Sequence, residues 1–254
     1  MPQKQLLLEL LTILTAYLNV KADFGQDYAQ DRQLLRGLCN QALTLDGIDP
    51  RFYQLQDALL SAEREAKGVI DVDTFTYHDN VTWWQGDITR LQADAIVNAA
   101  NAEYLGCFVP CHNCIDNVIM SASGFQMRDE LRQLRQSPTY ATQAVKVTQG
   151  YNLPCRLVFH VAGPQVVGPV TAHDRQHLAA CYRACLDEAH RRKLHNLVFC
   201  CIATGLYAFP NALACAIAVD TVRQWQQTHP SNLKVVFNVF QDVDKELYAQ
   251  KLSN

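Results

Sequence analysis

The sequence carries almost no net charge. Its 22 lysines and arginines face 25 aspartates and glutamates, which leaves a formal charge of −3 at pH 7. Such a chain has no broad basic surface to attract the phosphates of nucleic acid, so we do not expect a nucleic-acid partner. If an anionic ligand binds, local backbone N–H groups or a metal ion must hold it.

The sequence also has no apolar segment of the length that spans a membrane, so we expect no membrane partner. The stretch LLLELLTILTAYLNV (6–20) comes closest, but Glu9 interrupts it and no small-x-small cleavage site follows it. Its leucines recur at helical spacing, which favours an amphipathic helix over a signal peptide. Internal repeats and low-complexity segments are absent as well.

Cysteine, in contrast, is abundant, with ten residues in the chain. Their spacing is not that of a small secreted disulfide scaffold, and a chain of 254 residues with 49% apolar content can build a core without disulfides. Cys200 and Cys201 lie inside an apolar run, which suits reduced and buried thiols. We therefore expect a cytoplasmic protein.

The pattern of apolar residues divides the chain near residue 75. Residues 1–75 have helical periodicity, with Asp49-Pro50 as a cap and first-turn pair and Gly68 as a helix end. We interpret this region as a helical N-terminal extension, and we find no nucleotide-binding loop in it.

Residues 76–254 alternate short apolar runs with helical segments. The runs AIVNAA, RLVFHVAG, NLVFCCIA and LKVVFNVF predict strands, and residues 172–193 and 211–227 predict helices. This alternation predicts an α/β fold, a three-layer α/β/α sandwich with a mixed, largely parallel central sheet.

Three predicted loops follow strands and carry polar residues, at the edge of the sheet where α/β proteins bind ligands. Asp87 either accepts a hydrogen bond from an exocyclic amine or caps a helix. Asn98 and Asn101 close a strand, where asparagine is costly unless it contacts a ligand or forms a turn. Thr204-Gly205 lets backbone N–H groups face an anion, and Tyr207 either stacks on a sugar or base or packs in the core.

Taken together, GDIT (86–89), VNAAN (97–101), RLVFHVAGP (156–164) and IATGLYAFPNALACAIAV (202–219) resemble a macrodomain, the ADP-ribose-binding α/β/α module, in order and spacing. In ordinary macrodomains a Gly-rich phosphate loop follows VNAAN, whereas here the segment is LGCFVPCHNCIDN (105–117). That replacement, together with the helical extension, is similar to the zinc-containing macrodomains, which are protein-ADP-ribose hydrolases found chiefly in microbes. The resemblance covers nearly the whole chain.

The resemblance implies a role for each matching residue. Asp87, with Ile88 beside it, matches the acid that hydrogen-bonds the adenine amine. Asn98 and Asn101 match asparagines near the distal ribose, and Asp116 stands where the non-zinc hydrolases carry an acid that helps to activate water. Asn101 and Asp116 are thus the implied catalytic residues. The loop around the diphosphate is matched by Ala203, Thr204, Gly205, Leu206 and Tyr207.

The subfamily's metal pattern, Cys-x4-His-x-Cys, is matched by Cys107, His112 and Cys114. Two thiolates and one imidazole suit Zn²⁺, and three protein ligands leave one tetrahedral position open, as in catalytic sites. Cys111 is either a fourth ligand or a spectator; we expect a spectator, since adjacent residues seldom bind one ion well. Buried thiols or a disulfide between two of these cysteines are the alternatives without a metal.

The resemblance implies a zinc-dependent hydrolase that removes ADP-ribose from modified protein side chains. It points to carboxylate-linked mono-ADP-ribose on a small carrier protein, with a sirtuin-type transferase as the opposing enzyme. The alternative is a catalytically weak module that binds ADP-ribose and holds a structural zinc. Met120, where relatives usually have His, and Ala208, where many macrodomains have Gly, keep this alternative open. Ser123, where Ala is common, is a further departure from the pattern. A zinc-stabilised scaffold without nucleotide is a third interpretation, disfavoured by the joint occurrence of three pocket motifs.

Overall fold

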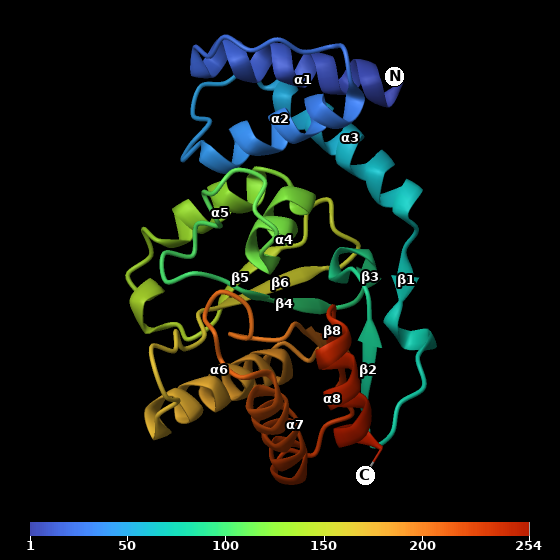
Figure 1. The fold of residues 1–254 in the computed structure, drawn as a ribbon, viewed down its shortest axis with the longest axis vertical. Coiled ribbons are helices and arrows are strands. Elements are labelled where there is room, and N and C mark those ends of the chain that lie inside the picture. Colours follow the sequence, from blue (N-terminus) through green and yellow to red (C-terminus); the bar gives the residue numbers. More distant parts are fainter. Residues whose placement is uncertain (254) are drawn as a thin grey trace.

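The structure, a computed structural model, describes residues 1–253 and places a helical unit on a larger α/β/α domain (Figure 1). The N-terminal unit consists of α1 (Gln3–Leu18), α2 (Tyr28–Gln41) and α3 (Arg51–Lys67). Leucines from all three helices form its core, which Phe125 of the larger domain completes. The helical extension expected from the sequence is therefore confirmed.

Local sequence signals set the ends of these helices. Asp27 caps α2 by accepting a hydrogen bond from Gln30 N at 2.8 Å. Asp49 Oδ1 accepts one from Arg51 N at 2.9 Å just before α3, and Gly68 ends that helix with φ of 76°. Among residues 1–253, no helix combines the length and apolar character needed to cross a membrane.

A six-stranded sheet forms the middle layer of the larger domain, in the order β2-β8-β7-β4-β6-β5. Five strands are parallel and only β5, at one edge, is antiparallel to its neighbour β6. The mixed, largely parallel sheet expected from the apolar runs is thus confirmed. The strands are β2 (Val81–Gln85), β4 (Ala95–Ala99), β5 (Lys146–Gln149), β6 (Leu157–Val161), β7 (Asn196–Phe199) and β8 (Lys234–Val239).

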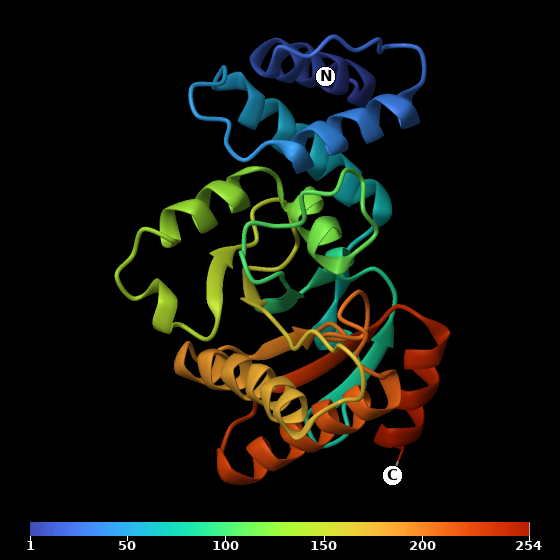
Figure 2. The same ribbon diagram turned by 60° about the vertical axis from the view of Figure 1, so that its left-hand side comes forward.

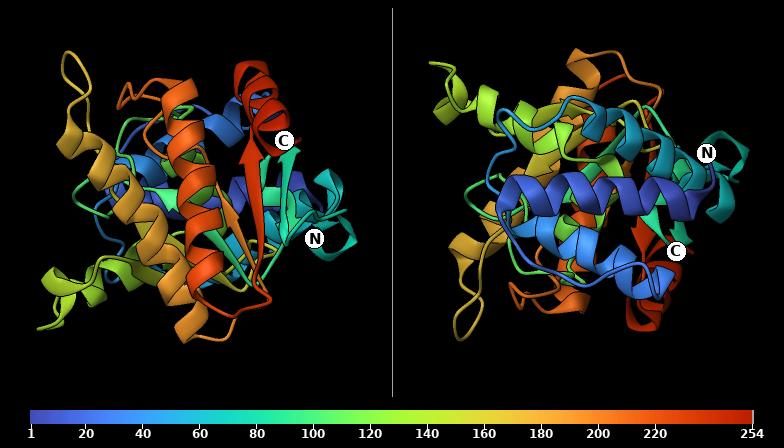
Figure 3. Two further views of the ribbon diagram at one scale, coloured as in Figure 1. Left: turned by 90° about the horizontal axis from the view of Figure 1, so that it is seen from below. Right: turned by 90° about the horizontal axis from the view of Figure 1, so that it is seen from above.

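Helices cover both faces of this sheet (Figures 1 and 3). On one face lie α4 (Ile115–Ser123) and α5 (Gln126–Leu134), and on the other α6 (Ala172–Arg191), α7 (Asn211–Thr228) and α8 (Asp242–Leu252). The N-terminal unit stacks on the α4–α5 layer (Figure 2). The short strands β1 (Ile70–Asp71) and β3 (Leu91–Gln92) pair beside the main sheet, so the chain joins the larger domain soon after α3.

Candidate functional site

The predicted site residues lie in loops at the carboxyl edge of the parallel strands. The loop 100–114 follows β4, the loop 200–210 follows β7, and Gly86–Asp87 follows β2. Because β4 and β7 are adjacent in the sheet, their two loops leave it side by side. β8 separates β2 from β7, so Asp87 stands at a distance from these two loops along the same edge.

Asp87 is the N-cap of a short 3-10 helix, η2 (Ile88–Arg90), so the capping interpretation is confirmed. Its Oδ1 accepts hydrogen bonds from Thr89 N at 3.0 Å and from Thr89 Oγ1 at 2.6 Å. Its Oδ2 faces Lys67 Nζ at 3.6 Å, and the side chain is 31% exposed. Capping therefore leaves Oδ2 able to accept a hydrogen bond from a ligand amine. The Ile88 side chain is 2% exposed and packs in the core.

Asn98 is fully buried at the end of β4, within a chain of polar side chains. Its Nδ2 lies 2.8 Å from Asp116 Oδ1 and 3.1 Å from His160 Nδ1. His160 Nε2 lies 2.9 Å from Thr148 Oγ1, an arrangement that places the imidazole proton on Nε2. Asn98 Oδ1 and Asp116 Oδ2 accept no hydrogen bond within residues 1–253. Both oxygens are buried acceptors that no group in the described part of the chain satisfies.

Asp116 lies in the first turn of α4 and is 4% exposed. Burial raises the pKa of its carboxyl to about 6, against the lowering effect of the Asn98 hydrogen bond. A carboxyl that changes protonation near neutral pH suits proton transfer, and such shifts are common at functional sites.

We expect His160 to make the folded state less stable as the pH falls. Burial lowers the pKa of His160 from 6.5 to about 3, because the imidazolium would lose its hydration. The unfolded chain therefore binds a proton in this range that the folded chain does not. The contribution of His160 is complete above the unfolded pKa and is lost as the pH falls below it.

Between about pH 7 and pH 5.5, this loss amounts to roughly 1 kcal/mol of unfolding free energy. Urea unfolding of the wild type and of His160→Gln at the two pH values isolates it from the other titrating groups. A wild type that loses no more stability than the variant would show that His160 does not stay neutral in the fold.

Asn101 holds the start of the loop 100–114 in a turn. Its Oδ1 accepts hydrogen bonds from Glu103 N at 3.0 Å and Tyr104 N at 3.1 Å, and its Nδ2 donates to Gly106 O at 3.0 Å. Both polar ends of the side chain are therefore engaged in shaping the loop. The turn interpretation of this asparagine is confirmed, and any contact with a ribose stays a prediction.

The loop after β7 is a closed turn with unpaired backbone donors. Phe209 N donates to Ala203 O at 3.0 Å and closes it. The N–H groups of residues 204–207 donate no hydrogen bond within residues 1–253, which leaves four backbone donors for an anion. α7 begins only at Asn211, so these four N–H groups lie in the loop that precedes the helix.

Leu206 and Tyr207 lie differently in this loop. The Leu206 side chain is 72% exposed, whereas that of Tyr207 is partly buried and packs against the core. Tyr207 O accepts a hydrogen bond from Val166 N at 2.9 Å, which ties the loop to the segment after β6.

Ala208→Gly is expected to stabilise the protein by roughly 1 kcal/mol. Ala208 has φ of 53°, a left-handed conformation that costs a residue with a side chain about 1–2 kcal/mol and glycine almost nothing. The gain is partly offset by the greater freedom of glycine in the unfolded chain. Ala180→Gly, in the exposed middle of α6, is the control and should cost about 1 kcal/mol. Chemical denaturation measures the stability of both variants. If the two substitutions destabilise the protein equally, Ala208 is not strained.

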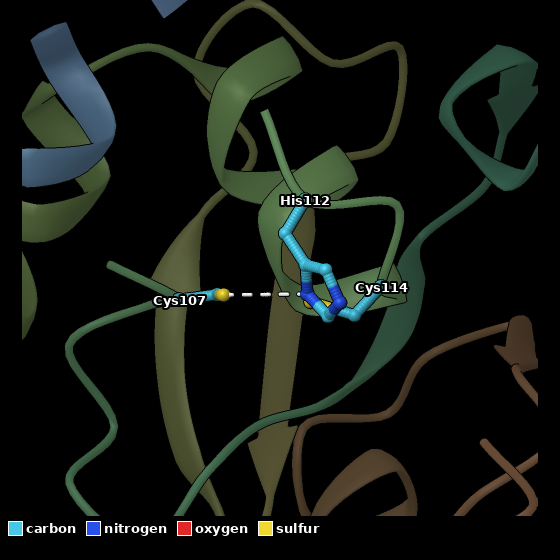
Figure 4. A group of neighbouring side chains, drawn as sticks. All are labelled: Cys107, His112 and Cys114. Atoms are coloured by element: carbon cyan, nitrogen blue, oxygen red, sulfur yellow. Dashed lines mark hydrogen bonds between the residues drawn. The ribbon is translucent and has the colours of Figure 1, made fainter. Parts of the chain in front are cut away.

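Cys107, His112 and Cys114 converge on one point (Figure 4). One ligand atom from each lies within 4.8 Å of the others, and no other such group of three occurs among residues 1–253. Cys107 Sγ is 3.6 Å from His112 Nδ1. Tetrahedral zinc with ordinary bond lengths holds sulfur and nitrogen about 3.6 Å apart, so this donor set and spacing fit a single ion.

Cys114 also caps α4, because its Sγ accepts a hydrogen bond from Asn117 N at 3.4 Å. Burial, and then the neighbouring thiol of Cys107, raise the pKa of Cys114 to about 12. Without a metal this thiol keeps its proton at neutral pH, so an ion that binds there must displace it.

Cys111 points away from the other three residues and toward the N-terminal unit. Its Sγ donates to Gln33 O at 3.1 Å, and its N–H donates to Asn40 Oδ1 at 3.0 Å. It does not belong to the group that could hold an ion. This position supports the spectator interpretation.

The sequence analysis did not identify three residues that hold the loop 100–114 in place, namely Arg36, Asn117 and Arg128. Arg128 is 2% exposed and donates to Leu105 O at 2.8 Å. The hydrogen-bond partners of Arg128 and of Arg36 lie far away along the chain. No local sequence pattern therefore predicts the role of either arginine. Asn117 had a weak signal, as the third residue after a helix-capping cysteine.

The fold and the position of these loops define a class of protein, the macrodomain. Residues 97–218 match the Macro domain family. An Oceanobacillus iheyensis macrodomain solved with ADP is similar at 31% identity, over 70% of this chain and 93% of that chain, with a TM-score of 0.62. A Trypanosoma brucei macrodomain shares the fold at 23% identity, over 91% and 95% of the two chains, with a TM-score of 0.64.

Similarity to curated proteins extends over most of the chain. A protein-ADP-ribose hydrolase of Staphylococcus aureus (strain MRSA252) is 41% identical over 223 residues, which are 86% of this chain and 83% of that protein. A protein of the same name from Treponema medium is 38% identical over 89% of each chain. The chain therefore belongs to the macrodomain family.

Proposed function

We propose that this chain is a protein-ADP-ribose hydrolase, which cleaves the bond between ADP-ribose and a modified protein side chain. The observation that carries the proposal is the convergence of Cys107, His112 and Cys114 in the loop after β4, the strand that pairs with β7, whose following loop carries the unpaired N–H groups. The similarity to relatives named for this activity supports it.

In this proposal, each loop at the carboxyl edge of the sheet contacts a different part of ADP-ribose. Asp87 Oδ2 accepts a hydrogen bond from the adenine amine, and the N–H groups of residues 204–207 bind the diphosphate. Asn101 keeps the loop after β4 in shape beneath the distal ribose. Asp116, whose burial raises its pKa to about 6, holds or accepts a proton beside that sugar.

We infer that the ion held by the two thiolates and the imidazole is zinc, since this donor set is the one that zinc prefers. A bound zinc would act as a Lewis acid and lower the pKa of a coordinated water toward about 7. Cys107, His112 and Cys114 would supply three ligands, and water or substrate would complete the coordination.

The proposal also covers the type of substrate and the cellular compartment. Resemblance to zinc-containing macrodomains favours carboxylate-linked mono-ADP-ribose on a small carrier protein, opposed by a sirtuin-type transferase. The ten unpaired cysteines favour the reducing cytoplasm. Assays on Glu-linked and Arg-linked ADP-ribosyl proteins separate the linkages, and release from the Arg-linked protein alone would overturn the carboxylate assignment.

A catalytically weak ADP-ribose-binding module is the second candidate. The Asn101 side chain is engaged at both ends, and Asp116 is almost fully buried. Both residues then shape the pocket without reaching the sugar. Incubation with an ADP-ribosylated protein tests the two candidates: a hydrolase frees ADP-ribose with repeated turnover, whereas the binding module retains ADP-ribose and leaves the protein modified.

A further inference from the structure

A helix of the N-terminal unit contacts the segment 105–114, which we call the metal loop. Arg36 of α2 donates to Asn117 Oδ1 from Nε at 3.0 Å and from Nη2 at 2.7 Å, and its Nη2 also donates to His112 O at 2.9 Å. Arg32, one turn earlier, pairs with the carboxylate of Glu63 at 2.6 Å. Arg36 instead directs its guanidinium to oxygens of the metal loop and of the helix that follows it.

Asn117 links Arg36 to the residues that could bind the ion. The residue is fully buried, and its Nδ2 donates to Val109 O at 2.9 Å and to Cys107 O at 3.5 Å. Its backbone N–H donates to Cys114 Sγ. Two guanidinium N–H groups on Oδ1 fix the orientation of the amide, because only its oxygen can accept them. Arg36 thereby sets the position of a residue whose side chain contacts the first half of the metal loop and whose backbone N–H contacts Cys114 at its end.

Asn40 holds the middle of the same loop. Its Oδ1 accepts the N–H of Cys111 at 3.0 Å, and its Nδ2 donates to Ser121 Oγ of α4 at 3.2 Å. Cys111 has φ of 53°, a conformation that is unfavourable for a residue with a side chain unless its surroundings hold it. The turn that precedes His112 thus depends on an asparagine of α2.

Arg128 of α5 fixes α2 itself in place. Its Nη1 donates to the carbonyl oxygens of Cys39, Asn40 and Ala42 at the end of α2, while its Nε donates to Leu105 O at the start of the metal loop. A cation at the carboxyl end of a helix is favourable, and here it joins that end to the loop.

We propose that α2 is part of the metal centre, with Arg36 and Asn40 as positioning residues that keep the metal loop in its ligand-bearing shape. Retention of the ion then depends on a helix about 70 residues earlier in the chain. The inference rests on the proposed function in one respect, namely that Cys107, His112 and Cys114 bind an ion. Removal of a residue that hydrogen-bonds to a metal ligand, without binding the ion itself, changes metal affinity by about 10–100-fold.

Metal release from the full-length protein tests the inference. The protein is loaded with Zn²⁺ and, separately, with Co²⁺; release to a colorimetric chelator and the visible spectrum of bound Co²⁺ are recorded. Arg36→Gln is expected to release Zn²⁺ at least about 10-fold faster than the wild type and to alter the Co²⁺ bands. Arg32→Gln is the matched control, because it removes an arginine of the same helix that does not touch the metal loop. Its release rate should stay within about twofold of the wild type.

Asn40→Ala supplies a second variant that leaves Arg36 in place, and it should release Zn²⁺ about threefold faster or more. Circular dichroism melts confirm that the compared variants are folded. Equal release rates for folded Arg36→Gln and Arg32→Gln overturn the inference and leave the proposed function standing. Wild-type rates in Arg36→Lys also overturn it, since lysine keeps the charge but not the two-pronged contact. A wild type that retains neither metal removes both the inference and the proposed metal site.

Discussion

Cys107→Ser, His112→Ala and Cys114→Ser are each expected to slow the release of ADP-ribose from a modified protein by more than about 100-fold. Each removes one of three ligands, and a two-ligand site retains an ion poorly. The fold should persist, because none of the three residues belongs to the core of the larger domain, which is built from the sheet and the helices on both its faces. Single-turnover assays, metal analysis and thermal melts check the three outcomes together.

Cys111→Ser is the matched control for these substitutions. Its Sγ donates to Gln33 O, a hydrogen bond that a serine hydroxyl can also make, and it lies outside the ligand group. Metal content and rate should therefore stay close to those of the wild type. Loss of both in Cys111→Ser alone would show that the ligands have been assigned wrongly.

Asp87→Ala is expected to weaken ADP-ribose binding by about 2 kcal/mol, or roughly 30-fold. The substitution removes the Oδ2 acceptor that we assign to the adenine amine. It also removes a helix cap, because Oδ1 accepts hydrogen bonds from Thr89. Calorimetric titration measures the affinity, and a separate melt measures the cost of the lost cap.

Asp71→Ala separates these two effects. Asp71 caps the 3-10 helix η1 (Val72–Thr74) with the same local geometry, through a hydrogen bond from Asp73 N at 2.9 Å. It should cost about the same stability as Asp87→Ala, roughly 1 kcal/mol, and leave ADP-ribose affinity unchanged. If Asp87→Ala binds ADP-ribose as tightly as Asp71→Ala, Asp87 is a cap and nothing more.

Most of the fold could be predicted because its signals are local. β4, β6, β7 and β8 are predominantly apolar runs, as strands buried on both faces should be. α4, α5, α8, the edge strand β5 and the short strands β1 and β3 were not predicted. β5 has only four residues with one face partly exposed, and α8 buries only Asp244 and Tyr248, so neither has a strong apolar period.

The candidate site divides in the same way. Cys107, His112 and Cys114 lie within eight residues, so their spacing by itself indicates a shared ion. The contact of Arg36 with Asn117 joins residues 81 apart, and it exists only because the N-terminal unit docks on α4. The sequence could not show that Cys111 lies apart from Cys107 and Cys114, because this depends on the backbone conformation. Cys111 is in a left-handed conformation, and its thiol contacts α2.

The most direct test of the account is single-turnover release of ADP-ribose from a Glu-linked ADP-ribosyl protein, before and after removal of the metal. We expect the metal-loaded protein to free ADP-ribose and the unmodified protein. The stripped but folded protein should be slower by more than about 100-fold and should recover when Zn²⁺ is restored. A stripped, folded protein that works at the loaded rate would contradict the account.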